Sequence, residues 1–137
     1  MRVRSLVSLL LFLMLMACER SSISDAESIT DVAKISGLNF PISAMVLFYE
    51  SSDRDIKVHY SHRVIQSSEN MPITYNPQLK LSADSMMAVM KSLLKRHDIG
   101  KAKNEAVFAD WKNQHGMWRG TWLETTTGFY LYLENFN

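Results

Sequence analysis

The last segment of the chain constrains the fold most strongly, because two runs of strand-forming residues flank the turn sequence Thr126-Thr127-Gly128. This pattern predicts an antiparallel hairpin with a three-residue loop, in which Gly128 takes the left-handed conformation. The loop length sets which residues face each other across the hairpin. The predicted pairs are Leu123 with Leu131 and Thr121 with Leu133 on one face, and Trp122 with Tyr132 and Glu124 with Tyr130 on the other. Both faces of this hairpin are therefore expected to carry apolar residues.

The rest of the sequence predicts two helices and three further strands. One helix is expected over residues 25–36, where Ser24 can cap the start and Gly37 can end it. A second helix is expected to run from Ser82 to a stop at Gly100. The strands are expected over residues 44–50, 56–65 and 106–111, with a long loop over residues 66–79. Together these elements predict a small two-layer α+β sandwich, in which two helices pack on a mostly antiparallel sheet of about five strands.

The first eighteen residues have the pattern of an export signal that ends at a cysteine. Arg2 and Arg4 precede an apolar run over residues 6–16, which is too short to span a bilayer as a helix. Cys18, the only cysteine, closes the sequence Leu15-Met16-Ala17-Cys18, which resembles the lipobox of bacterial lipoproteins. The resemblance implies that the thiol receives a diacylglycerol, with palmitate-type chains, and that a peptidase cuts just before Cys18. An ordinary cleaved signal peptide and an N-terminal transmembrane anchor are the alternatives.

The lipobox resemblance also implies a domain organisation and a location. Residues 1–17 would be the signal peptide, residues 18–24 a lipidated tether, and residues 25–137 a single periplasmic domain. The acyl chains on Cys18 would anchor this domain to a membrane. In lipoproteins of enterobacterial type, aspartate after the cysteine favours the inner membrane. Glu19 stands there in this chain, so the expected location is the outer membrane with the domain facing the periplasm, and the inner membrane is the alternative.

The charge balance and the cysteine count exclude several classes of function. Without residues 1–17 the chain has 13 basic and 14 acidic residues, a formal charge of −1. This balance argues against a nucleic-acid partner, which would require a clustered basic surface. Because Cys18 would be consumed by lipid, no thiol is left for a disulfide or for thiol catalysis.

No recognisable constellation of catalytic or metal-binding residues is present. His59 and His62 are three apart, but on a strand they would point to opposite faces, so neither a metal nor a cofactor is predicted. The chain contains no GxSxG motif and no glycine-rich phosphate loop. The carboxylates considered for acid and base chemistry are Asp53, Asp55 and Glu124, of which the first two look like turn formers.

Four aromatic residues are the candidate binding residues of this sequence. They are Trp118, Trp122, Tyr130 and Tyr132, which the predicted register places on one face of the hairpin. Tryptophan and tyrosine provide a large contact area at a low entropic cost, as suits a surface that binds a protein or a sugar ring. The structural alternative is that the first helix or the long loop packs over this face.

The sequence therefore favours a lipid-anchored periplasmic envelope protein that acts by binding another protein. It could be an accessory to an assembly or an immunity-type inhibitor of a toxin. The alternative is an envelope-active hydrolase on peptidoglycan or glycan. An open cleft with two carboxylates or both histidines would favour the hydrolase, and a flat aromatic patch would favour binding.

Overall fold

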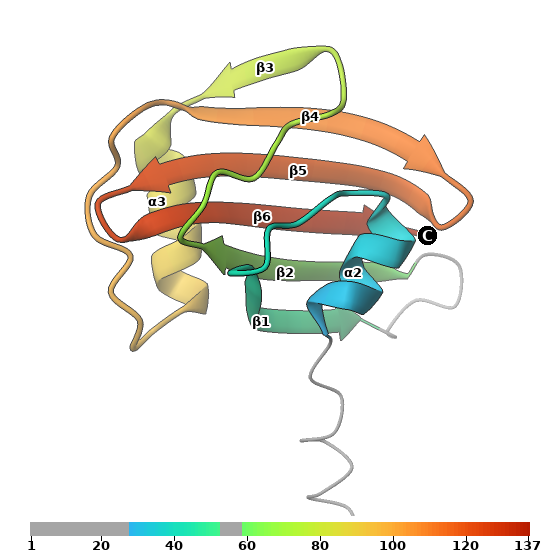
Figure 1. Ribbon diagram of the computed structural model, residues 1–137, viewed down its shortest axis with the longest axis horizontal. Coiled ribbons are helices and arrows are strands. Elements are labelled where there is room, and N and C mark those ends of the chain that lie inside the picture. Colours follow the sequence, from blue (N-terminus) through green and yellow to red (C-terminus); the bar gives the residue numbers. More distant parts are fainter. Residues whose placement is uncertain (1–27, 53–58) are drawn as a thin grey trace, which may run out of the picture.

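The computed structural model describes residues 28–52 and 59–137. In these residues, two helices flank a six-stranded sheet (Figure 1). The helices are α2 (Ile29–Ser36) and α3 (Ala83–Leu93). The strands are β1 (Met45–Ser52), β2 (Tyr60–Ser67), β3 (Gln78–Leu81), β4 (Ala106–Asn113), β5 (Gly116–Thr125) and β6 (Gly128–Phe136). The α+β prediction is confirmed, with six strands rather than about five.

Every strand pair in this sheet is antiparallel, and the strand order is β1-β2-β6-β5-β4-β3. Strands β4, β5 and β6 form consecutive hairpins, while the predicted hairpin β1–β2 joins the sheet beside β6. The additional strand, β3, begins inside the expected loop over residues 66–79. It has only four residues and lies at an edge, where few side chains are buried, so its sequence lacks the apolar pattern of an inner strand.

Helix α2 covers Ile29–Ser36 of the predicted range 25–36. Its N-cap is Ser28, whose hydroxyl accepts a hydrogen bond from the Asp31 backbone N–H at 3.2 Å. The expected start at residues 24–27 lies outside the described residues. The predicted end is confirmed, because Gly37 takes a left-handed conformation with φ of 78° and donates its N–H to the Ala33 carbonyl at 3.0 Å.

Helix α3 begins after Ser82 as predicted, but it ends at Leu93 rather than at Gly100. The chain turns there because two apolar residues beyond the helix enter the core. Leu94 is 7% exposed and Ile99 is 1% exposed. In the described residues, neither helix has the length and apolar character needed to cross a membrane.

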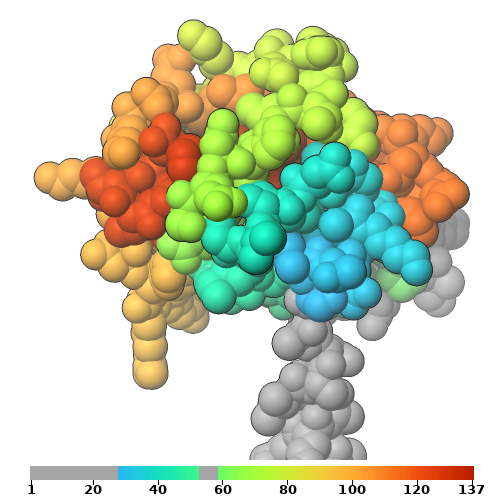
Figure 2. Space-filling model, in the orientation of Figure 1, coloured from blue at the N-terminus to red at the C-terminus, as the bar shows by residue number. Residues whose placement is uncertain are grey.

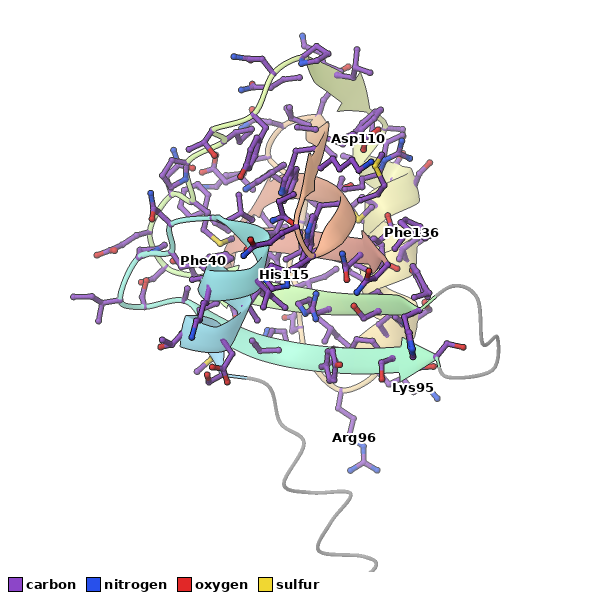
Figure 3. The ribbon with its side chains drawn as sticks, turned by 90° about the vertical axis from the view of Figure 1, so that its right-hand side faces the viewer. Phe40, Lys95, Arg96, Asp110, His115 and Phe136 are labelled. Carbon is purple, nitrogen blue, oxygen red and sulfur yellow. The ribbon has the colours of Figure 1, made fainter. Side chains whose placement is uncertain are left out.

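The two helices pack on opposite faces of the sheet, as the view along the strand ends shows (Figure 3). Val32 of α2 packs against Ile65 and the tryptophans of β4 and β5. The α3 methionines pack on the other face, beside Val64 and Leu123. Figure 2 shows that α2 and the segments before β1 and after β2 cover the first face. The predicted two-layer arrangement is therefore wrong: both sheet faces are apolar, so each needs cover, and the domain has three layers.

The register of the β5–β6 hairpin differs from the prediction by one residue. Thr125 pairs with Gly128, so the loop has two residues and Trp122 faces Leu131. The Thr127 N–H donates to the Thr125 hydroxyl at 3.1 Å and stabilises this shorter turn. A shift of one residue changes which side chains share a face.

Candidate functional site

The four predicted aromatic binding residues are all buried, and they do not share a face. Trp118 and Trp122, at 1% and 8% exposure, lie on the α2 side of the sheet. Tyr130 and Tyr132, at 0% and 8%, lie on the α3 side. The prediction that they form one aromatic surface is wrong, because it depended on the three-residue loop. These residues form two cores rather than a binding face.

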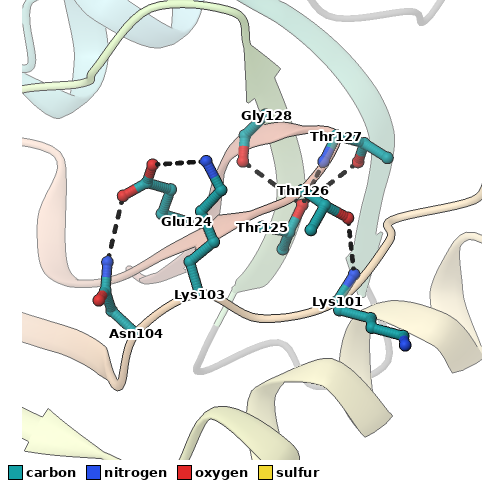
Figure 4. A network of polar contacts seen from close by, with 8 residues as sticks. All are labelled: Lys101, Lys103, Asn104, Glu124, Thr125, Thr126, Thr127 and Gly128. Carbon is teal, nitrogen blue, oxygen red and sulfur yellow. Dashed lines mark hydrogen bonds and ion pairs between the residues drawn. The ribbon is translucent and has the colours of Figure 1, made fainter.

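The other sequence candidates are dispersed. Asp53 and Asp55 lie outside the described residues. Glu124 is held by Asn104, whose amide Nδ2 donates to its carboxylate at 3.2 Å, and by the Lys103 ammonium at 3.5 Å (Figure 4). None of the acidic or histidine residues in the described part of the chain gathers in a group of three or more that could hold a metal ion.

Helix α3 covers only one end of its sheet face, and the other end carries exposed apolar side chains. Met117 and Phe136 face each other across β5 and β6, with exposures of 48% and 44%. Leu79 on the edge strand β3 is 53% exposed. Phe136 and Asp110 both project on the α3 side of the sheet (Figure 3). We call this region the open face; its residues are Leu79, Phe108, Asp110, Met117, Arg119 and Phe136.

A charged pair crosses the open face between β4 and β5. The Arg119 guanidinium donates two hydrogen bonds to the Asp110 carboxylate, at 2.7 and 2.9 Å. These bonds lower the pKa of Asp110 and raise the pKa of Arg119. The guanidinium also lies 4.7 Å from the centre of the Phe108 ring. The pair therefore offers a fixed, nearly neutral polar element among apolar side chains.

A cluster of hydrogen-bonded side chains borders the open face on β2 and β6. The Tyr132 hydroxyl lies 2.9 Å from Nδ1 of His62 and 3.2 Å from the Tyr60 hydroxyl, which donates to the Glu134 carboxylate at 3.0 Å. Nε2 of His62 lies 3.8 Å from the Glu50 carboxylate. Burial raises the pKa of both tyrosines, so their hydroxyls stay protonated at neutral pH. We call these residues the tyrosine–histidine cluster.

His59 is the first described residue after residues 53–58. It precedes β2, and its backbone N–H and carbonyl exchange hydrogen bonds of 2.8 Å with those of Asn137. His62 lies on the α3 side, with its ring stacked on Tyr60 at 5.1 Å between centroids. The tyrosine–histidine cluster thus places one histidine and two carboxylates beside the apolar residues of the open face, where they can form hydrogen bonds.

A pocket of about 180 Å³ lies at the end of the sheet where β5 turns into β6. It contains three sequence candidates, Trp122, Tyr130 and Glu124. Its remaining walls come from segments far apart in the chain: Asn70, Met71 and Ile73 after β2, Asn104, Glu105 and Val107 at the start of β4, and Leu123 and Phe129 of the hairpin. The pocket therefore combines buried apolar side chains with polar ones.

The open face could not be predicted from the sequence, although part of its signal is present in β5. Met117 and Arg119 alternate there with Trp118 and Gly120, so the period-two pattern separates an exposed side from a buried one. The pattern does not show that α3 leaves this end of the sheet uncovered. That depends on where the helix packs, which is a tertiary property.

Comparison of the chain with protein-family models, with curated proteins and with solved structures finds no match. The functional assignment therefore depends on the residues described above.

Proposed function

We propose that this protein is a lipid-anchored envelope protein of the periplasm, and that it binds another protein through the open face. The observation that carries the proposal is the adjacent pair Met117 and Phe136, about half exposed on a sheet face that α3 leaves uncovered. Exposed apolar side chains that gather in one region are typical of interaction sites. Leu79 and Phe108 extend the apolar area toward β3.

The composition of the open face favours a protein as its partner. Methionine, phenylalanine, tyrosine and arginine are enriched at protein–protein interfaces, and lysine is depleted. The open face has Met117, Phe136 and Phe108, with Tyr60 at its border, and its arginine is already neutralised by Asp110. A partner should therefore present apolar side chains at the centre and polar groups around them. Such a partner fits an accessory role or an immunity-type role equally.

The proposed anchor agrees with the position of helix α2. The nine residues 19–27 join Cys18 to Ser28, and an extended chain of this length reaches at most ~35 Å. Lys95 and Arg96 lie at the same end of the molecule as the first turn of α2 (Figure 3). Cations at that end would favour contact with anionic lipid headgroups.

Lipidation is expected to depend wholly on Cys18. Cys18→Ser should abolish incorporation of labelled palmitate and leave the precursor uncut, because serine has no thiol to accept the diacylglycerol. Membrane fractionation of the wild type should place the protein in the outer membrane, as Glu19 suggests. Normal labelling of the variant would refute the anchor, and recovery in the inner membrane would refute the sorting argument.

We expect a partner protein to crosslink to the exposed residues of the open face and not to exposed residues elsewhere. A photo-crosslinking amino acid at position 117 or 136 should trap one partner protein in living cells. The same probe at position 89, an exposed site on α3, should not trap it. Met117→Lys should weaken capture at position 136 while changing the free energy of unfolding by less than about 1 kcal/mol, as is usual for surface substitutions.

Two outcomes would contradict the binding proposal. Equal crosslinking at positions 89 and 136 would show that capture is not specific to the open face. Release of soluble fragments from peptidoglycan by the purified protein, lost in Glu124→Gln, would favour the hydrolase instead. Met117→Lys separates protein binding from hydrolysis. It changes the open face and leaves Glu124 unchanged, so it should weaken partner capture without affecting release from peptidoglycan.

A further inference from the structure

We infer that the pocket at the β5–β6 turn binds one ring of a neutral, N-acetylated sugar. This site is distinct from the open face, and the inference does not depend on protein binding there. The pocket contains Trp122, Phe129 and Val107 from the sheet, together with Met71 and Ile73 from the segment after β2. Its volume of about 180 Å³ is smaller than that of pockets for drug-sized ligands, so it suits a single ring.

The floor of the pocket is apolar and aromatic. Trp122 is 8% exposed and Met71 is 2% exposed, and the side chains of Ile73 and Val107 beside them are partly exposed. The side chains of Leu123 and Tyr130 pack on the α3 side of the sheet, so they do not form the floor. Phe129 is partly buried and packs against the same core as Trp122. The C–H groups of a pyranose ring form an apolar face that packs on aromatic rings, and an acetyl methyl group fits beside aliphatic side chains. This floor therefore matches the apolar parts of an N-acetylated sugar.

The rim of the pocket supplies hydrogen-bond donors and acceptors. Asn70, Asn104 and Glu105 are exposed, and the Glu124 side chain is 32% exposed. Amide groups both donate and accept, while a carboxylate accepts from several donors at once. Sugar hydroxyls and an acetamido group need this combination. Glu124 retains acceptor positions for a ligand hydroxyl, because the contacts with Lys103 and Asn104 occupy only part of its four lone-pair sites.

The Glu124 carboxylate is held in place before any ligand arrives. Asn104 donates to one of its oxygens and Lys103 contacts the other (Figure 4). The Lys103 backbone N–H also donates to the Glu124 carbonyl at 2.9 Å, which ties the rim segment to β5. Less side-chain entropy is then lost on binding, which favours affinity for a small ligand.

The charges around the pocket favour a neutral ligand. Glu124 contacts Lys103 at 3.5 Å, and Glu105 contacts Lys80 at 3.5 Å. Each carboxylate is thus accompanied by a cation. An anionic ligand would meet two carboxylates, and a cationic ligand would have to compete with two lysines. A neutral ligand that binds through hydroxyl and amide groups avoids both the repulsion by the carboxylates and the competition with the lysines.

The test is a titration of the full-length protein, purified in a zwitterionic detergent, with chitotriose as the neutral sugar and choline as a cationic comparison. Saturation-transfer NMR and tryptophan fluorescence report binding. We expect chitotriose to bind and choline to give no response. Glu124→Ala and Asn104→Ala should each raise the Kd about tenfold or more, the effect of losing a hydrogen bond to a charged group or its positioning partner.

Two control variants keep the test decisive. Glu69→Ala removes an exposed carboxylate that is not among the pocket residues, and it should leave the Kd unchanged. Glu105→Ala changes an exposed rim residue and should weaken binding without affecting the melting temperature, even if Glu124→Ala unfolds the protein. Absence of chitotriose binding to the folded wild type would overturn the inference. Binding of choline alone, or a Kd for chitotriose unchanged in the rim variants, would do the same.

Discussion

Trp118→Ala is expected to lower the free energy of unfolding by about 3 to 5 kcal/mol, the range for removing a large buried aromatic side chain. Trp118 is 1% exposed, and its ring stacks on Trp111 at 6.2 Å between centroids. Its indole N–H donates to the Asn113 side chain at 2.9 Å, and the Arg63 guanidinium lies 5.6 Å from its ring centre. Alanine would leave a cavity between these groups. Urea-induced unfolding followed by circular dichroism measures the loss.

The neighbouring residue provides a matched control. Met117 precedes Trp118 in β5 and projects on the opposite face, where it is 48% exposed. Met117→Ala should therefore change the free energy of unfolding by less than about 1 kcal/mol. Similar losses in both variants would contradict the assignment of one face to the core and the other to the open face.

The existence of most elements could be predicted from the sequence, because their signals are local. Gly37 ends α2 through a left-handed conformation, and Ser82 precedes α3. The hairpin of β1 and β2 follows from two strand-forming runs around a polar turn. Only the edge strand β3, which has few buried residues, lacked such a signal.

The register of β5 and β6 could not be predicted, because both faces of this hairpin are buried. A register is well specified by sequence when one face is apolar and the other polar, since a slip then exposes the apolar side. Here Trp122 and Leu131 lie under α2 and its flanking segments, while Leu123 and Tyr130 lie under α3. Either register places apolar residues on both faces. The choice depends on the Thr125–Gly128 turn and on packing.

The burial of Arg63 also could not be predicted from the sequence. The alternation of β2 predicts a polar face for it, yet it is 1% exposed. Its guanidinium lies 5.1 Å from the Tyr49 ring centre and 5.6 Å from that of Trp118. Cation–π contacts of this kind favour a buried arginine only when the aromatic rings are brought together by the fold. The predicted aromatic surface was wrong because it depended on the three-residue loop, and the observed register places Trp122 opposite Leu131.

The stability of the protein is expected to fall steeply above pH 10. Burial raises the pKa of Tyr60, Tyr130 and Tyr132 above the ordinary tyrosine value of 10.0, and in each case burial is the largest cause. Above pH 10 the unfolded chain therefore releases protons that the folded protein still holds. The free energy of unfolding then decreases as the pH rises. Each proton that the folded protein retains contributes at most about 1.4 kcal/mol per pH unit to this slope.

Tyr60→Phe isolates one of these protons. Urea-induced unfolding at several pH values between about 10 and 12 gives the slope for each protein. The variant should show the smaller slope, by a difference that approaches about 1.4 kcal/mol per pH unit once the unfolded tyrosine is fully ionised. The difference between the two slopes removes the contribution of every other group that the two proteins share. Tyr60 suits this test because it is partly buried and its hydroxyl donates to Glu134, so phenylalanine keeps the ring contacts with His62 and Phe136. Equal slopes would show that the Tyr60 hydroxyl ionises as readily in the folded protein as in the unfolded chain, so that burial does not raise its pKa.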